Sequence, residues 1–290
     1  MNSEITQTVF GKTETGETAL LYRIPNNTND YIEITNYGCT MKSICIHDGQ
    51  GSLRNVLSGG ENLETCQQSA EGLGMIRDHL SPALSQCLSH KLWQTQEIGQ
   101  NHIFLTCRLS EAESGLHTAL TVGARIMWVN LNRIVIDLFS APERGALIAP
   151  ECNLVFHLTD TDDYALRSFC PQILSGGQTL PVEKTVYAEM AFVPLAESAP
   201  TLLSSPEEVK PIAELASGAA GLTISAYGNM DSLSVQKLPE SSAALTQAML
   251  YGISLKSGES FAGRLIYGFD RLYSPDEINS PKPSPFDIFL

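Results

Sequence analysis

Hydrophobic and polar residues alternate with a period of two along most of the chain. The alternation is clearest in six segments, at residues 19–24, 31–35, 40–46, 103–109, 119–128 and 133–139. Successive side chains of a β-strand point to opposite faces of a sheet, so this pattern predicts strands with one face in a core. Residues 133–139 also carry the branched side chains that pleated, half-buried surfaces favour.

Turn-forming residues separate these segments, and further strands follow them. Clusters of Asn, Asp, Gly and Pro lie at residues 25–27, 36–38, 48–51, 130–132 and 175–177. Later strands are predicted at 186–192, 221–227, 233–236 and 260–269, and one short helix at 205–215, near Pro206 and two glutamates. Many short strands joined by close turns predict an all-β protein, a large antiparallel β-sandwich.

The strands form one predicted domain, and a different segment follows it. No linker, internal repeat or charge run interrupts residues 1–273. Residues 274–290 form a Pro-rich C-terminal tail, which favours an extended path, and the tail ends in Phe286-Asp287-Ile288-Phe289-Leu290. An exposed apolar end is an aggregation liability, so we expect the tail to pack on its own domain. Docking of the tail on a partner is the alternative.

Composition and charge narrow the class of partner. The chain has 290 residues, of which 43% are hydrophobic and 17% charged, enough for a sizeable core. With 18 Lys and Arg against 32 Asp and Glu, the net charge is -14, which repels nucleic acids and anionic membranes. No apolar run approaches the roughly 18 residues that a membrane helix needs. The expected partner is a neutral small molecule or another protein, a second copy of the chain included.

The cysteines and the chain start indicate a cytoplasmic protein. Seven cysteines, an odd number, are scattered without a Cys-x-x-Cys motif, and no secretory signal precedes them. Such thiols are expected to be reduced. Cys39 and Cys45 lie an even number of residues apart on one predicted strand, so they would share a face. The acidic run at 160–163 lacks the Gly and Glu of a calcium loop, so no metal site is expected.

Ordered blocks of residues carry a resemblance to a known family. The blocks are Ile32-Glu33-Ile34-Thr35-Asn36-Tyr37-Gly38, Asp48-Gly49-Gln50-Gly51, Lys91-Leu92-Trp93-Gln94, Phe156-His157-Leu158, Gly176-Gly177-Gln178-Thr179-Leu180-Pro181 and Leu255-Lys256-Ser257-Gly258-Glu259. Over roughly residues 5–273, their order and spacing resemble the galactose mutarotase (aldose 1-epimerase) family. The resemblance implies a large antiparallel β-sandwich that holds a sugar in an open groove. It also implies ring opening by a general base and a general acid, without a metal or organic cofactor.

The chain departs from that family at the positions of the acid and the base. The alignment puts Asn153 where the family has the His that acts as general acid, and His157 where the family has an Asn. An amide does not release a proton near neutral pH, although it hydrogen-bonds hydroxyls. Asn153 and His157 are four residues apart and share a strand face. At the family's base position stands the uncharged segment 245–247.

Further candidate residues lie between Arg77 and Trp93, where the chain is shorter than the family. Arg77 ends a segment, 74–77, that resembles the surroundings of the family's sugar-binding Arg. His79 and His90 follow in a predicted loop, and each is a candidate to replace the missing general acid. The predicted sugar-binding residues are therefore Arg77, Asn153 and His157. No catalytic residue is assigned, and His157, His79 and His90 are the candidates; a buried or solvated histidine without a catalytic role is the alternative for each.

Two functional hypotheses follow, with a scaffold protein as a third. A positioned proton-transfer group contributes about 10²–10⁴-fold to the reaction rate, so loss of both the general acid and the general base leaves little beyond binding. The first hypothesis is an aldose 1-epimerase-like protein that binds a carbohydrate and has lost or weak mutarotase activity. The alternative is an active sugar epimerase whose acid and base have moved to one of the three histidines and a nearby carboxylate.

Overall fold

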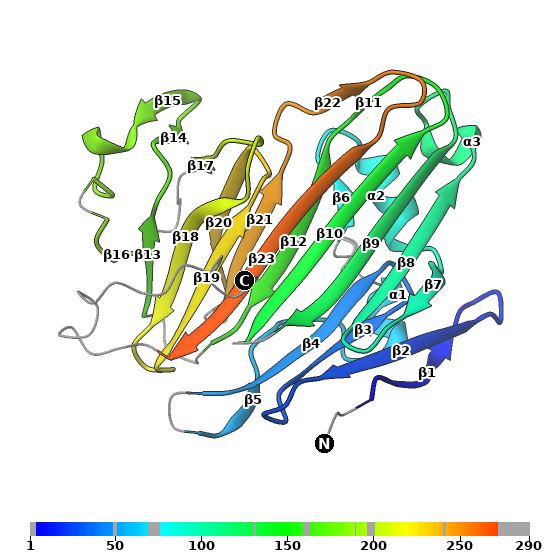
Figure 1. Cartoon of the computed structure of the whole chain (residues 1–290), viewed down its shortest axis with the longest axis horizontal. Coiled ribbons are helices and arrows are strands. Elements are labelled where there is room, and N and C mark those ends of the chain that lie inside the picture. The colour runs from blue at the N-terminus through cyan, green and yellow to red at the C-terminus, as the bar shows by residue number, and fades with distance from the viewer. Residues whose placement is uncertain are drawn as a thin grey trace.

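The computed structural model describes most of the chain. The described residues are 4–48, 51–68, 76–129, 132–158, 163–188, 190–195, 201–239 and 242–271. The predicted tail at 274–290 and residues 160–162 of the acidic run lie outside them. Within these ranges the strands form four antiparallel sheets, of nine, seven, five and two strands. In Figure 1 the nine-stranded sheet faces the viewer and the seven-stranded sheet lies behind it, so the predicted antiparallel β-sandwich is confirmed.

The elements are as follows. In sheet order, the nine-stranded sheet contains β16 (Val193–Pro194), β13 (Tyr164–Ser168), β18 (Lys210–Ser217), β19 (Leu222–Gly228), β23 (Phe261–Arg271), β10 (Arg133–Pro142), β9 (Leu120–Val129), β8 (His102–Leu109) and β7 (Gln94–Ile98). The seven-stranded sheet contains β15 (Gln178–Pro181), β14 (Gln172–Ser175), β17 (Thr201–Leu203), β20 (Ser232–Leu238), β21 (Ser242–Ala248), β12 (Pro150–Phe156) and β6 (Ile76–Asp78). The two smaller sheets contain β1 (Thr6–Lys12), β2 (Thr18–Pro25), β3 (Tyr31–Thr35), β4 (Thr40–His47) and β5 (Leu53–Asn55), and β11 (Ala146–Ile148) with β22 (Ile253–Leu255). The helices are α1 (Leu63–Gln68), α2 (Pro82–Ser89), α3 (Glu111–Ser114) and the short 3-10 helix η1 (Val182–Lys184).

The core lies between the two large sheets. Every second residue along β10 and β12 belongs to it, as the period-two pattern predicts: Ile134, Ile136 and Leu138 of β10, and Cys152, Leu154 and Phe156 of β12. Phe156 of β12 packs against Tyr267 of β23, with ring centroids 5.9 Å apart. Trp93 and Trp128 are 1% and 3% exposed, so both tryptophans belong to the core.

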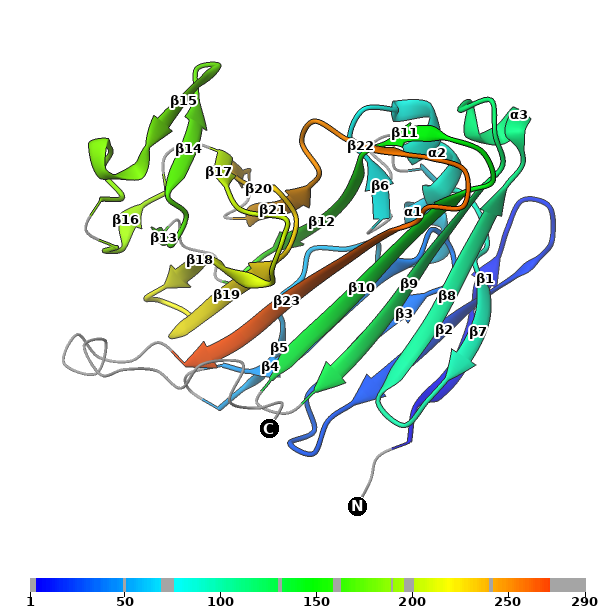
Figure 2. The same ribbon diagram turned by 45° about the horizontal axis from the view of Figure 1, so that its top comes forward.

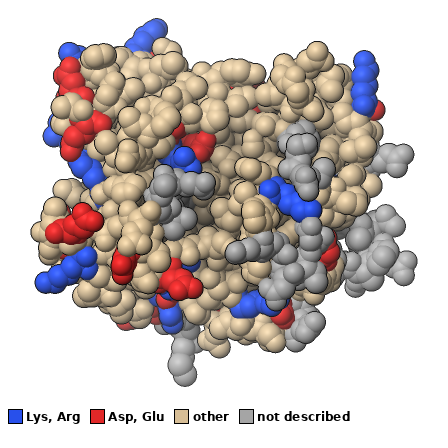
Figure 3. All heavy atoms as spheres, turned by 180° about the vertical axis from the view of Figure 1, so that it is seen from behind, with Lys and Arg blue, Asp and Glu red and all other residues tan. Residues whose placement is uncertain are grey.

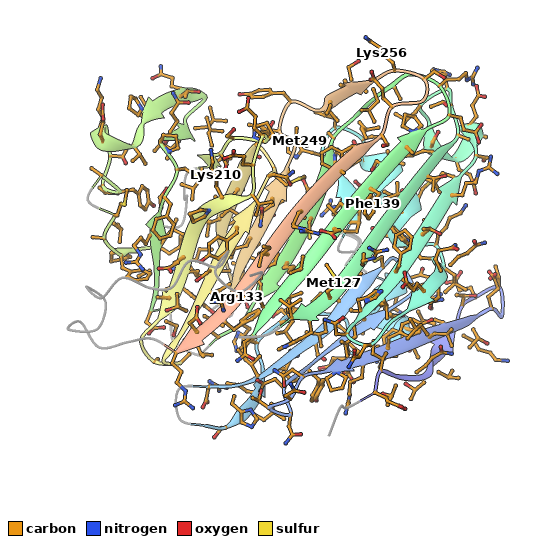
Figure 4. All side chains as sticks on the ribbon, viewed as in Figure 1. Met127, Arg133, Phe139, Lys210, Met249 and Lys256 are labelled. Atoms are coloured by element: carbon orange, nitrogen blue, oxygen red, sulfur yellow. The ribbon has the colours of Figure 1, made fainter. Side chains whose placement is uncertain are left out.

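The outer face of the nine-stranded sheet carries ion pairs across neighbouring strands. Arg264 of β23 lies 2.6 Å from Asp137 of β10. Arg133, labelled in Figure 4 at the start of β10, lies 3.1 Å from Asp270 of β23. Cross-strand pairs of opposite charge are favourable because their side chains stand on one face at short distance. The charges on this face are therefore largely neutralised by each other.

Two predicted elements are wrong. The helix predicted at 205–215 is replaced by β18, which pairs with β13 and β19. The register of β18 against β19 shifts between Pro211 and Ala213, and such an irregularity accommodates a proline that has no N–H for the ladder. The strand predicted at 186–192 is also absent from its described residues, which form turns, and Val186 is 70% exposed.

Helix α2 occupies the segment that the sequence predicts as a loop between His79 and His90. The Ser81 hydroxyl caps its first turn by accepting a hydrogen bond from the N–H of Leu84 at 3.2 Å, and Pro82 follows the cap. The helix packs close to β6, since Ser85 Oγ donates to the carbonyl of Asp78 at 2.8 Å. Of the helices that the structure describes, none is long and apolar enough to cross a membrane.

Candidate functional site

The outer face of the seven-stranded sheet brings together most of the predicted site residues. Strand β12 lies between β21 and β6. Cys152 and Leu154 of β12 point into the core, so Glu151 and Asn153 stand on the opposite, outer face. Figure 2 shows β12, β21 and β20 between the β14–β15 hairpin at one end and α2 with β11 and β22 at the other.

Glu151 is the centre of a charged cluster on this face. Its side chain is 10% exposed, and Oε2 lies 3.0 Å from Nδ1 of His79. Oε1 lies 3.6 Å from Nε of Arg77, which stands opposite Glu151 on the neighbouring strand. The structure therefore places two predicted residues, Arg77 and His79, around a carboxylate that the sequence analysis did not select. The signal for Glu151 was its position two residues before Asn153, on the same strand face.

Asn153 is part of a row of neutral hydrogen-bonding groups. Thr246 of β21 stands directly opposite it, and the Thr246 hydroxyl donates to Oδ1 of Asn153 at 3.0 Å. Farther along the same face, the hydroxyls of Ser234 and Thr201 lie 2.9 Å apart. Ser234 stands opposite Thr246, so the row crosses β12, β21, β20 and β17. Hydroxyls and amides both donate and accept, which suits recognition of a polyhydroxylated ligand.

Asp78 holds the segment that carries Arg77 and His79. Its Oδ1 accepts hydrogen bonds from the N–H groups of Leu80, at 3.1 Å, and Ser81, at 2.9 Å. Its Oδ2 accepts from the N–H of Ala149 at 2.8 Å. The Asp78 side chain thus joins the start of α2 to the residue before β12. The residues on either side of Asp78 are held in place by these three bonds.

The other two histidines lie apart from this cluster. His157 is on the same side of the sheet as Asn153, and its Nδ1 lies 3.4 Å from the Ser242 hydroxyl. Four residues at the rise of a β-strand put it about 13 Å from Asn153 along the chain. His90 ends α2, with Nδ1 3.0 Å from the carbonyl of Gln86. Its ring meets that of Tyr37 edge to face, with centroids 6.4 Å apart. His90 therefore does not join Arg77 and His79.

The chemistry of this face is hydrogen bonding by largely uncharged groups. Figure 3, which views the molecule from behind, shows few acidic or basic side chains, and several of those lie in groups of opposite sign. Among the described residues, no group of His, Cys, Asp and Glu could hold a metal ion. Burial raises the pKa of the Cys152 thiol beneath Glu151 and Asn153, so this cysteine is unsuited to act as a nucleophile.

Comparison with known proteins shows what this fold is. No protein-family model and no curated protein sequence matches the chain. Among solved structures, a GalM/aldose epimerase homologue from C. elegans matches with a TM-score of 0.75 and 12% identity, over 87% of this chain and 98% of the homologue. The galactose 1-epimerase from Lactobacillus acidophilus NCFM matches with a TM-score of 0.74 and 12% identity, over 93% of this chain and 99% of that enzyme. The chain has the galactose mutarotase-like fold.

A further match points the same way. A galactose mutarotase-like protein from Lactobacillus casei ATCC 334 has a TM-score of 0.64 and 12% identity, over 86% of this chain and 100% of that protein. Such low identity establishes the galactose mutarotase-like fold and no more, because one fold hosts many activities. The fold implied by the sequence resemblance is therefore confirmed, and the chemistry must be argued from the residues of this chain.

Proposed function

We propose that this protein binds a neutral carbohydrate on the outer face of the seven-stranded sheet. The observation that carries the proposal is the convergence of Arg77, Glu151, Asn153 and Thr246 from three neighbouring strands. Sugar hydroxyls are bound by hydrogen bonds to such groups and require no net charge. Binding of a neutral ligand is also compatible with the net charge of -14.

We also propose that mutarotase activity is weak or lost. The positions that the family resemblance assigns to the acid and the base hold Asn153 and the segment 245–247. Within that segment Leu245 and Gln247 are buried, and Thr246 alone meets Asn153 on the outer face. Neither an amide nor a hydroxyl titrates near neutral pH, so this pair supports binding more than proton transfer.

Calorimetric titration with a panel of aldoses, glucose and galactose included, tests the binding proposal. Asn153→Ala should weaken binding about 2- to 10-fold, because one neutral hydrogen bond contributes about 0.5–1.5 kcal/mol. Gln7→Ala, an exposed polar residue of β1, is the matched control and should leave binding unchanged. No heat with any sugar would overturn the proposal and favour an interaction scaffold.

One observation favours the alternative, an active sugar epimerase. His79 Nδ1 lies 3.0 Å from the Glu151 carboxylate, so Nδ1–H donates to it and Nε2 is left to exchange protons. In that mechanism Nε2 takes the proton of the anomeric hydroxyl, the C1–O5 bond breaks and a carbonyl forms. Solvent water protonates the ring oxygen, and the reverse transfers close the ring on the other face of the anomeric carbon.

Polarimetry on freshly dissolved α-glucose and α-galactose separates the two functions. The binding proposal expects rates close to the buffer blank. A rate at least tenfold above the blank, abolished in His79→Gln and Glu151→Gln, would establish the epimerase instead. His157→Ala tests the second histidine of this face. His47→Gln is the matched control, because His47 also pairs with a carboxylate, that of Asp30 at 2.6 Å, but in the five-stranded sheet.

A further inference from the structure

A cavity lies away from the outer face of the seven-stranded sheet. Its volume is about 550 Å³, within the range of about 300–1,000 Å³ that small-molecule sites occupy. It is lined by the turn between β1 and β2, the last turn of α1, the residues after α2 and the strand β8. None of the residues proposed above to bind sugar on the sheet face lines it.

The inner wall of this cavity is aromatic and uncharged. Tyr37 is 5% exposed and packs with Leu63 and Cys66 of α1 in a small hydrophobic cluster. Burial, together with nearby Cys66 and Glu14, raises the pKa of the Tyr37 phenol, so this group stays neutral. Leu92 and the ring of His90 complete the wall. This surface suits the carbon framework of a small ligand.

The two basic residues of the cavity are paired with carboxylates outside it. Lys91 Nζ lies 2.5 Å from Oε1 of Glu113. This hydrogen bond from Lys91, with others from Ser110, lowers the pKa of Glu113 to about 2, so the carboxylate is ionised. Arg108 pairs with Glu143. These two ion pairs largely neutralise the charges of Lys91 and Arg108. Glu113 and Glu143 are not among the lining residues of the cavity.

The acidic residues of the cavity have no such partners. Glu14 makes no ion pair with any described residue, and Glu17 accepts a hydrogen bond from the Thr15 hydroxyl at 3.0 Å. A carbonyl only accepts, so Nδ1 of His90 donates to Gln86, and Nε2 is the ring nitrogen left to face a ligand. The cavity therefore presents unneutralised negative charge and acceptors to whatever enters it.

We propose that this cavity binds a small hydroxylated ammonium ion, an amino alcohol or amino sugar. The ammonium group would lie near Glu14 and Glu17, since charge-assisted hydrogen bonds are the strongest available there. The carbon framework would pack on Tyr37, whose ring face also attracts cations. Hydroxyl groups of the ligand would meet the side chains of Thr106 and Gln94. The acidic surface of the whole chain attracts such a cation to the site.

Calorimetric titration with D-glucosamine and N-acetyl-D-glucosamine tests the proposal. At about pH 7 an amine beside electron-withdrawing groups, like the peptide α-amino group with its pKa of roughly 7.7–8.0, is mostly protonated, whereas acetylation removes the charge and keeps the sugar. Glucosamine should bind at least about fivefold more tightly, and more weakly at higher salt. Glu14→Gln should reduce its affinity roughly two- to fivefold, the contribution of an ion pair at an exposed carboxylate. Glu4→Gln, an exposed glutamate outside the cavity, should change nothing.

The sheet-face variant Asn153→Ala separates the two sites. Glucosamine binding that survives in Asn153→Ala and falls in Glu14→Gln places the ammonium in the cavity. Equal affinity for the two amino sugars, an unchanged affinity in Glu14→Gln, or a loss in Asn153→Ala alone would overturn the proposal.

Discussion

At the residue scale, Asp78 shows how one buried carboxylate organises the side chains around it. The residue is 8% exposed and accepts three backbone hydrogen bonds, from Leu80, Ser81 and Ala149. A buried charge is tolerated only when donors surround it, and here the donors belong to the segments that carry the candidate site. The positions of Arg77 and His79 therefore depend on a neighbour whose own side chain lies on the opposite strand face from Arg77.

Removal of this carboxylate should destabilise the protein. Asp78→Ala should lower the free energy of unfolding by about 2–4 kcal/mol, because three N–H groups lose their acceptor in a buried region. Asp78→Asn keeps one acceptor oxygen and should cost about half as much. Urea denaturation followed by fluorescence measures both. Equal stability of the alanine variant and the unchanged protein would contradict the role given to Asp78.

Glu33 makes stability depend on pH. Burial alone would raise the pKa of its carboxyl, but hydrogen bonds from Arg23, Lys42 and Ser43 hold that pKa below its usual value. The folded pKa lies below the unfolded value of about 4.3, so this stabilisation is complete above about pH 4.3 and is lost as the pH falls through the folded pKa. Glu33→Gln should therefore cost about 1–3 kcal/mol at pH 7 and much less near pH 3. Denaturation curves at the two pH values check this, and a difference independent of pH would refute it.

At the element scale, the packing of α2 against the turn between β3 and β4 requires a glycine. Gly38 has φ +64 and a Cβ on it would lie 2.4 Å from the carbonyl oxygen of Ser89, which belongs to the α2 backbone. The Gly38 N–H also donates to the carbonyl of Lys91 at 2.8 Å. The turn and the helix end can approach this closely only without a side chain at Gly38.

Gly38→Ala should therefore destabilise the protein by about 2–4 kcal/mol, the sum of a backbone strain and a steric clash with backbone atoms. Gly16→Ala is the matched control: Gly16 has φ +84 but no atom within 4 Å of the added Cβ, so the strain alone, about 1 kcal/mol, is expected. Thermal unfolding of the two variants measures the difference. Similar melting temperatures would show that contact with Ser89 is not the decisive term.

Local irregularities explain where the strand prediction failed. Cys39 and Cys45 do not share a face as predicted, since the pairing of β3 with β4 shifts between Glu33 and Ile34 and leaves Lys42 unpaired. Cys39 therefore belongs to the core with Met41 and Ile44, whereas Cys45 stands opposite Tyr31. Alternation along one strand does not reveal such a bulge. The extra residue inverts the facing of the residues beyond it, but it is recognised only against the partner strand with which it fails to pair.

At the scale of the whole molecule, burial controls the reactivity of the thiols. All seven cysteines are free, and Cys87 is the one that is not fully buried. Burial raises the pKa of Cys107 to about 11 and that of Cys170 to about 12, so their reactive thiolates are scarce near neutral pH.

Thiol titration of the folded protein with a coloured disulfide reagent at pH 8 should therefore give one rapidly reacting group, and Cys87→Ser should abolish that phase. All seven thiols should react once urea unfolds the chain, because unfolding removes the burial that protects them. Several rapid phases in the folded state would contradict the buried environment of the other cysteines.

The amino-acid sequence was sufficient for the all-β class, for the central strands β8, β9, β10, β19 and β23 of the nine-stranded sheet and for the galactose mutarotase-like fold. Alternation and turn residues are local signals, so they survive in a single sequence. The candidate site is different in kind: His79 and Glu151 are separated by 72 residues and Asn153 and Thr246 by 93, and their contacts depend on strand register. Alternation shows which face a side chain occupies but not which strand lies beside it, and only the folded sheets supply that partner.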